Sequence, residues 1–287
     1  MVVKRNGCIT NPLTDISGTR ATRPFDTILL HTILLALSVS LSDTPSVLIV
    51  IAMEDEAKPF IEHLGVEKQD SFFSSNLPFQ AFSGKYEGCS VTVVTNGKDA
   101  VYGTGVDNVG TVPAAMVTYL ALEKLPETDL VLNAGTCGGF QKKGAKIGSV
   151  FLTSAVANHD RRIQIPPFIP YGIGKVESPS TANLQKEFGW QTGVCTTGNS
   201  LDHTPEDDTN MDTNDASVKD MEGASIAWAA KLASKEYVGV KVVTDIVDGD
   251  RPTQDEFLEN LGTAAKSLQD ALPKVIGYVC GKKLSEL

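Results

Sequence analysis

The hydrophobic positions of this chain fall into short apolar runs separated by longer segments with helical spacing. The run at 47–52, VLIVIA, is apolar throughout and is typical of a buried strand. Acidic residues at 54–56 follow it directly and Gly65 ends the next segment, which predicts a helix with an acidic first turn. Further strand candidates recur at 129–134, 149–155, 193–197 and 237–243.

Turn and helix signals separate these strands. Residues 79–86 and 90–95 flank Glu87-Gly88 and predict a β-hairpin. The Pro- and Gly-rich stretch at 159–175 predicts a long loop. Apolar and small residues at helical spacing predict helices within 106–124, 223–234 and 253–280, the last containing the potential breaker Pro273. Strands that alternate with helices indicate an α/β layered domain.

The glycine-rich run at 133–139, NAGTCGG, directly follows the apolar segment 129–132. Its three glycines predict a tight turn at the strand exit and a close approach of the backbone to a ligand. Successive N–H groups in such a turn can face a ribose or a phosphate. The alternative is a glycine-rich strand exit without a ligand.

Three carboxylates are candidates for chemistry. Glu56 follows a strand end, where open α/β sheets place ligands, and is a candidate for orienting or deprotonating a water. Glu222, between Met221 and Gly223, is a candidate for binding the vicinal hydroxyls of a sugar. Both positions also suit an acid that simply stabilises a helix N-terminus.

Asp245 is the strongest of the three candidates because it ends an apolar strand, where an ionised side chain is costly unless it is used or paired. Burial would raise its pKa and let it donate a proton near neutral pH, whereas Lys241 or Arg251 as ion partners would act the other way. Cys137 has no base beside it in the sequence and is expected to pack rather than to act as a nucleophile.

Composition narrows the function classes. The chain has 287 residues, 41% of them hydrophobic, which is enough for one large domain with a substantial core. A formal net charge of -10 argues against binding to nucleic acid or to an anionic membrane. The five cysteines are scattered and without metal-ligand spacing, so we expect reduced cysteines in a reducing compartment and no structural zinc.

Residues 1–45 differ from the rest of the chain. Basic residues precede the apolar run 28–37, which is short for a membrane span but fits the core of a targeting peptide. A disordered extension, or a start codon placed too early, is an equal alternative. We therefore expect a single folded domain at 46–287 in a cytoplasmic protein, with organellar or secretory targeting through 1–45 as the alternative.

Four motifs in order resemble the methylthioadenosine/S-adenosylhomocysteine nucleosidases, over most of the chain from residue 47 onward. They are IAMEDE at 51–56, NAGTCGG at 133–139, MEG at 221–223 and TD at 244–245. The plant-type branch is the most similar, because of TVP at 111–113, NHDRRI at 158–163 and TDIVDGD at 244–250.

This resemblance implies a three-layer α/β/α sandwich with a central mixed sheet, as in nucleoside phosphorylases, and a homodimer. It implies hydrolysis of the adenine–ribose bond of 5'-methylthioadenosine in methionine salvage, with no metal or organic cofactor; whether S-adenosylhomocysteine is also accepted stays open. By motif, Asp245 matches the acid that protonates adenine N7, Glu56 the residue that handles the water, and Glu222 the ligand of the ribose hydroxyls.

The resemblance also implies binding residues. Met221 matches the residue that packs on the sugar, and Thr136, Cys137 and Gly138 match the segment along the adenine and ribose. Leu201 and Asp202 match the segment beside the purine, although this chain has Asn199 where the plant pattern has Asp. The apolar residues of loop 163–168 are expected to help form the pocket for the 5'-thio group, contributed by the partner subunit.

Two alternatives remain at this point, one within the same fold and one from another class. Nucleoside phosphorylases carry an arginine near the start of the glycine-rich run, where this chain has Asn133; this favours water over phosphate, although Arg161 or Arg162 could still supply charge. A non-catalytic nucleoside-binding or storage relative would have no evident need for Glu56, Glu222 and Asp245 together.

Overall fold

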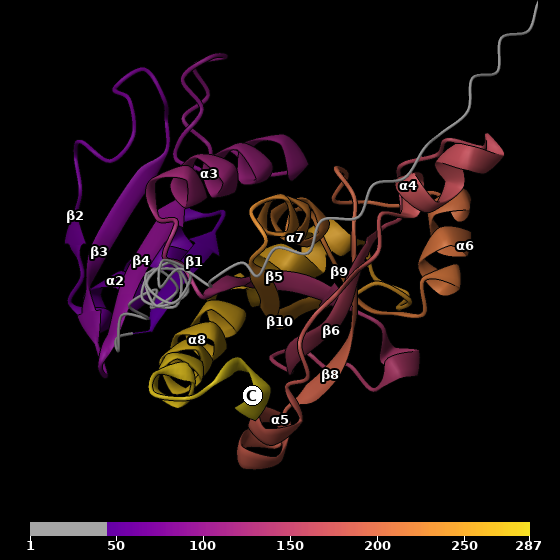
Figure 1. Cartoon of the computed structure of the whole chain (residues 1–287). Helices are drawn as coiled ribbons and strands as arrows, with labels where there is room; N and C mark the ends of the chain where they lie inside the picture. The colour runs from indigo at the N-terminus through magenta and orange to yellow at the C-terminus, as the bar shows by residue number, and fades with distance from the viewer. Residues whose placement is uncertain (1–44) are drawn as a thin grey trace, which may run out of the picture. The chain divides into compact units, whose positions relative to one another are not determined.

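A ten-stranded mixed sheet forms the middle layer of the computed structural model, which describes residues 45–287 (Figure 1). The expectations for residues 1–44, the extension and its targeting signal, lie outside the described residues. The strand order is β10-β6-β8-β9-β5-β1-β4-β3-β2, with β7 paired to β6. Because β5 also pairs with β10, the strands from β10 to β5 form a closed ring.

Three parallel strands lead to one edge of this sheet. They are β1 (Ser46–Ile51), β5 (Leu130–Gly139) and β10 (Glu236–Ile246), with β5 between the other two. All three are buried over almost their whole length, as their apolar sequences predict. Side chains that follow β1, and those that end β5 and β10, are thereby brought to the same place.

Helices cover both faces of the sheet and give the predicted three layers (Figure 1). Helices α2 (Glu54–Leu64) and α8 (Thr253–Val279) pack together on one face, over a core that includes Phe60 and Leu272. Helices α3 (Thr111–Lys124) and α7 (Gly223–Leu232) pack together on the other face. Pro273 does not interrupt α8, because the buried residues on either side of it hold the helix against the sheet.

The remaining elements complete the sheet and its edges. The predicted hairpin is confirmed as β3 (Gln80–Tyr86) and β4 (Cys89–Thr95), whose two-residue turn has a positive φ at both Glu87 and Gly88. The other elements are β2 (Glu67–Lys68), η1 (Gln141–Lys143), β6 (Val150–Asn158), η2 (Pro166–Phe168), α4 (Ile169–Ile173), β7 (Val176–Glu177), α5 (Ala182–Phe188), β8 (Gln191–Thr197), α6 (Pro205–Thr213), β9 (Ala216–Asp220) and η3 (Leu284–Glu286).

The glycine-rich run is extended rather than turned, which corrects one prediction. Residues 133–139 continue β5 and pair with β10. The glycines instead allow side chains to approach the strand closely. A Cβ on Gly139 would lie 2.6 Å from the Cβ of Ala145, and one on Gly138 would meet the side chains of Asp245 in β10 and of Val247 directly after it. Small residues in this strand therefore make room for groups from neighbouring elements.

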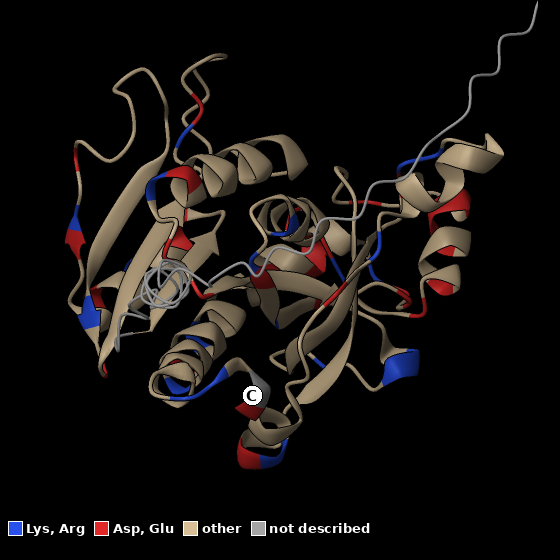
Figure 2. Cartoon of the chain, in the orientation of Figure 1, with Lys and Arg blue, Asp and Glu red and all other residues tan. Residues whose placement is uncertain are grey.

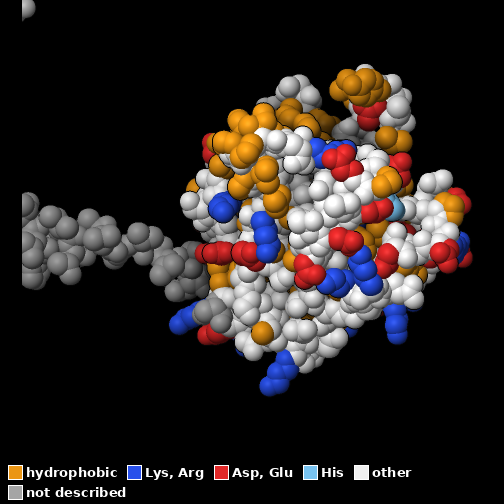
Figure 3. Space-filling view, turned by 90° about the vertical axis from the view of Figure 1, so that its right-hand side faces the viewer, with side chains coloured by type: hydrophobic (Ala, Val, Ile, Leu, Met, Phe, Trp, Pro, Cys, Tyr) orange, Lys and Arg blue, Asp and Glu red, His pale blue; other side chains and the backbone are white. Residues whose placement is uncertain are grey.

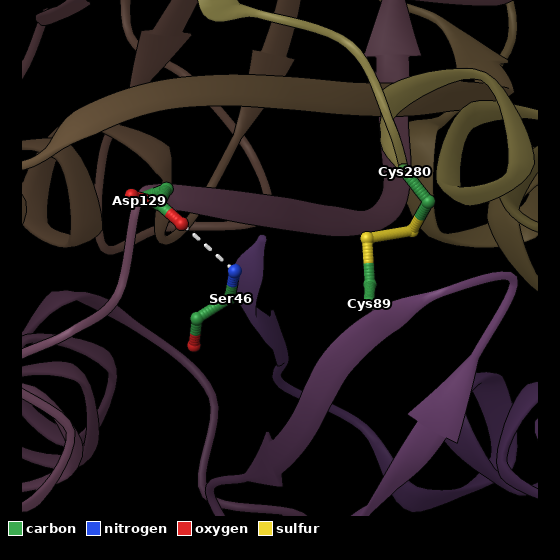
Figure 4. The surroundings of a disulfide bond; sticks show 4 residues. All are labelled: Ser46, Cys89, Asp129 and Cys280. Carbon is green, nitrogen blue, oxygen red and sulfur yellow. Dashed lines mark hydrogen bonds between the residues drawn. A yellow bond between two sulfur atoms is a disulfide. The ribbon is translucent and has the colours of Figure 1, made fainter. Parts of the chain in front are cut away.

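The expectation that the cysteines are all reduced is also wrong. Cys89, at the start of β4, forms a disulfide with Cys280, directly after α8 (Figure 4). The two residues are 191 positions apart in the sequence, yet their Cα atoms lie 5.4 Å apart. The spacing of cysteines along the chain gave no sign of this pair, because only the packing of α8 against the sheet brings them together.

Two further predictions need smaller corrections. The helix expected within 106–124 begins at Thr111, and residues 96–110 form a loop instead. The stretch at 159–175 is not loop alone, since it contains η2 and α4. Within residues 45–287, no helix combines the length and the apolar character that a membrane span requires.

Candidate active site

A cavity of about 450 Å³ opens where β1, β5 and β10 end. It is lined by most of the residues singled out in the sequence: Glu56, Thr136, Cys137, Gly138, Leu201, Met221, Glu222 and Asp245. Asp202 is exposed and is not among the lining residues. The fold thus gathers residues from positions 56 to 245 around one space.

Glu56 lies in the first turn of α2 and is held by β5. Its Oε1 accepts hydrogen bonds from the backbone N of Thr136 at 2.9 Å and from Thr136 Oγ1 at 2.7 Å. Burial raises the pKa of Glu56, while the bonds from Thr136 and the charge of Lys241 act in the other direction. The result is a fixed, buried carboxyl group whose basicity is increased.

Asp245 is placed by an irregularity in β10. Val243 pairs with Cys137 and Asp245 pairs with Gly138, so Thr244 is an extra residue on the β10 side. Thr244 Oγ1 lies 2.7 Å from Asp245 Oδ1 and 3.0 Å from the carbonyl oxygen of Cys137. This bulge brings the Asp245 carboxyl group to the wall of the cavity.

The pKa of Asp245 is raised by burial, as its position in the sequence predicts, and is lowered in part by Thr244 and by Lys219. Neither expected ion partner contacts it. Lys241 pairs with Asp220, and Arg251 pairs with acidic residues of α8. A protonated Asp245 is therefore favoured more strongly than it would be in water.

Glu222 lies between β9 and α7 and faces the cavity from a third direction. Its Oε1 accepts a hydrogen bond of 2.8 Å from the backbone N of Gly110, directly before α3. It occupies the N-cap position of α7 without capping the helix through its side chain. Burial, together with the neighbouring charge of Asp220, raises the pKa of Glu222 to about 7.

A buried ion pair lines the same cavity as these three carboxyl groups. Lys241 Nζ lies 2.7 Å from Asp220 Oδ2, and both side chains are 1% exposed. Burial acts to raise the pKa of Asp220, but Lys241, Thr197 and the backbone N of Gly223 outweigh it, so the pKa is lowered. This pair was not predicted, because Asp220 lies on β9, which was not among the expected strands, and Lys241 lies on β10.

The carboxyl groups of Glu56 and Asp245 lie at different positions along β5. Glu56 contacts Thr136, and Asp245 lies against Gly138. Two residues of extended strand span roughly 7 Å, so a ligand group can lie between these carboxyl groups. Phe257, Val106 and Val109 also line the cavity, and their apolar character alone did not identify them as site residues.

The other candidate charges lie away from this cavity. Arg161 stacks on Tyr171, with its guanidinium carbon 4.6 Å from the ring centre, and Arg162 pairs with Asp207. Both arginines line a separate cavity of about 180 Å³. Among residues 45–287, no cluster of three or more His, Cys, Asp or Glu side chains is arranged to hold a metal ion.

Charge is concentrated inside the molecule as well as on its surface. Figure 2 shows acidic segments near α7 and β10 in the middle of the fold, in addition to those on α6. The cavity-lining acids are Glu56, Asp107, Asp220, Glu222 and Asp245, against the two lysines Lys219 and Lys241. The described cavity is therefore suited to a cationic or polar neutral ligand rather than to an anion.

Comparisons with known proteins identify the family. The family model of the phosphorylase superfamily matches residues 46–277. A 5'-methylthioadenosine nucleosidase of Arabidopsis thaliana is 46% identical over 243 residues, covering 84% of this chain and 90% of the relative. A 5'-methylthioadenosine/S-adenosylhomocysteine nucleosidase of the same plant is 43% identical, covering 84% and 94%. The solved apo structure of the Arabidopsis 5'-methylthioadenosine nucleosidase matches with a TM-score of 0.82 and 45% identity, covering 85% of this chain and 99% of that one.

Proposed function

Because this chain belongs to the phosphorylase superfamily and, within it, to the 5'-methylthioadenosine nucleosidases, we propose that it hydrolyses the N-glycosidic bond of 5'-methylthioadenosine. The products are adenine and 5-methylthioribose. The observation that carries this proposal is the convergence of Glu56, Glu222 and Asp245, from three separate elements, on one cavity of about 450 Å³. The small-molecule substrate is thus an adenine nucleoside.

The chemistry of bond cleavage assigns each carboxyl group a task. As the bond to C1' breaks, the ribose becomes positively charged and the adenine negatively charged. Asp245, whose pKa is raised by burial, gives its proton to N7 of the departing base. Glu56 takes a proton from the water whose oxygen bonds to C1', and Glu222 accepts hydrogen bonds from the ribose hydroxyls. One water is consumed and every proton has an acceptor.

Several contacts support water rather than phosphate as the nucleophile. Asn133, at the position where phosphorylases carry an arginine, donates from Nδ2 to the carbonyl oxygen of Val50 and accepts a bond from the Tyr237 hydroxyl. Lys241 is paired with Asp220, and Lys219 Nζ donates to two backbone carbonyls. A phosphate in this cavity would face carboxylates with both described cations already engaged.

Adenine release from 5'-methylthioadenosine by the full chain, with and without inorganic phosphate, tests this proposal. We expect release that does not depend on phosphate. Release that requires phosphate would identify a phosphorylase, and no release in either condition would favour a non-catalytic binder. The same assay with S-adenosylhomocysteine determines whether the second substrate of the Arabidopsis relative is accepted as well.

A homodimer is the assembly that the exposed apolar surface favours. On the α3 and α7 side, Val112, Met116, Tyr119, Trp228 and Leu232 are 44–67% exposed. Figure 3 shows hydrophobic side chains gathered in the upper part of one face, while charged side chains are spread over the rest. Apolar groups concentrated in this way are typical of an interface. Sedimentation should show a dimer that Met116→Glu converts to a monomer.

The apolar residues near 165–169 are a second part of this proposed assembly. Ile165, Phe168 and Ile169 are 41–56% exposed and do not line the 450 Å³ cavity of their own chain. We place them at the 5'-thio side of the partner's cavity. Phe168→Ala should then raise KM for 5'-methylthioadenosine and leave the dimer intact.

A further inference from the structure

Lys219 is a buried lysine for which the proposed mechanism gives no task. It lies on β9, where it pairs with Gly138 of β5, and its side chain lines the main cavity. The residue is 6% exposed. Burying an ammonium group is costly, and a methionine or leucine of similar size would avoid that cost.

The ammonium group is held by backbone carbonyls rather than by an ion pair. Lys219 Nζ donates to the carbonyl oxygen of Leu201 at 2.6 Å and to that of Ser200 at 3.1 Å. None of the ion pairs found within residues 45–287 includes Lys219, and the neighbouring Asp220 pairs with Lys241 instead. Both carbonyls belong to the bend between β8 and α6, and Leu201 lines the cavity.

Lys219 also lies near the proposed acid, because it pairs across the sheet with Gly138, the residue against which Asp245 lies, and both side chains line the cavity. Burial lowers the pKa of Lys219, and among the carboxylates that raise it Asp245 has the largest effect. In return, Lys219 is the cation that lowers the pKa of Asp245, while Glu256 of α8 acts against it. The other charged groups that act on Lys219 are Asp220, Asp202 and Asp207.

We propose that Lys219 is a positioning residue that holds the Ser200–Leu201 backbone at the purine side of the cavity and faces Asp245 with its charge as that residue gives up its proton. This proposal rests on the proposed function. The Lys219 side chain has two effects. Its hydrogen bonds keep Leu201 where it can cover the base, and its charge stabilises the carboxylate that remains on Asp245 after proton transfer.

Three variants separate these consequences. Lys219→Met keeps a side chain of similar length but removes the positive charge and the hydrogen-bond donors. Lys219→Arg keeps the positive charge and the hydrogen-bond donors. The matched control is Lys235→Met, since Lys235 Nζ donates to the carbonyl oxygen of Pro126 at 2.5 Å but does not line the cavity. Adenine affinity is measured by calorimetry, and kcat for 5'-methylthioadenosine is measured from pH 5 to pH 10.

For Lys219→Met we expect adenine affinity to fall about tenfold, the effect of two lost hydrogen bonds that order the segment. Activity that needs a protonated Asp245 is lost as pH rises through its pKa. Because removal of a neighbouring cation raises that pKa, the alkaline limb of the kcat profile should move to higher pH. The alkaline limb of the kcat profile of Lys219→Arg should lie at the same pH as that of the wild type. Lys235→Met should match the wild type in adenine affinity and in the kcat profile.

Unchanged adenine affinity together with an unmoved alkaline limb in Lys219→Met would overturn the proposal. If Lys219→Met does not fold, a moved limb in Lys219→Arg would overturn it. A wild-type protein that binds adenine but does not cleave 5'-methylthioadenosine would refute the proposed function, and adenine affinity alone would then decide the role of Lys219. A wild-type protein that does not bind adenine would refute both.

Discussion

A Cβ atom on Gly138 would lie 2.7 Å from Oδ2 of Asp245. The same atom would lie 2.6 Å from Cγ2 of Val247, so neither neighbour leaves space for a methyl group. The carboxyl group of Asp245 can therefore lie this close to the main chain of β5 only because residue 138 is glycine. The glycine-rich run and the acidic residue of β10 form one structural unit.

Gly138→Ala should displace the carboxyl group of Asp245 and lower kcat/KM for 5'-methylthioadenosine by about 100-fold, because a misplaced catalytic group loses most of its effect. Gly262→Ala is the matched control, since that glycine of α8 is exposed and an added Cβ would meet nothing within 4 Å. The control should keep full activity and gain about 0.5–1 kcal/mol of stability. Equal activity of Gly138→Ala and Gly262→Ala would contradict the close approach of Asp245 to Gly138.

Asp245→Asn should remove the proton donor while preserving the shape of the cavity. We expect kcat for 5'-methylthioadenosine to fall by a factor of about 10²–10⁴, the usual contribution of a general acid. Binding of the nucleoside should change little, because the amide fills the same space. Single-turnover kinetics and calorimetry measure the two effects separately, and an unchanged kcat would disprove the assignment.

The raised pKa of Glu222 predicts a pH dependence of substrate affinity. Its pKa is about 7, so below that pH the group is mostly protonated and accepts fewer hydrogen bonds from the ribose hydroxyls. KM for 5'-methylthioadenosine should therefore fall as pH rises through about 7. Glu222→Gln should have a higher KM that no longer varies in this range. A KM that varies equally in both proteins would assign the titration to another group.

The disulfide between Cys89 and Cys280 should contribute to stability and not to turnover. It ties the end of α8 to the start of β4, whereas the cavity lies where β1, β5 and β10 end. Reduction should lower the free energy of unfolding by about 2–4 kcal/mol, because it releases a long loop in the unfolded chain. The melting temperature should fall by roughly 4–16 °C. Cys280→Ser should melt at the lower temperature with or without reductant and keep wild-type kcat at 25 °C.

Sequence patterns located most of the elements but misjudged the one with the most glycines. The apolar runs predicted β1 and β10, because a strand buried on both faces needs an uninterrupted hydrophobic sequence. The strand candidates at 149–155 and 193–197 correspond to β6 and β8. The prediction of a turn at 133–139 was wrong, because glycine is compatible with a turn and also with a strand that neighbouring side chains approach closely. Only the position of β10 beside β5 distinguishes these two cases.

By itself, the sequence determined the layered α/β architecture, the family, and the carboxyl groups Glu56, Glu222 and Asp245, since hydrophobic periodicity and short motifs are local properties of the chain. Only the tertiary structure decided how these groups are surrounded. It pairs Lys241 with Asp220, sets Lys219 against Asp245, joins Cys89 to Cys280, and leaves Asp202 outside the cavity. These relationships join residues that are distant in the sequence, and burial and packing in three dimensions alone fix which charges and which thiols meet.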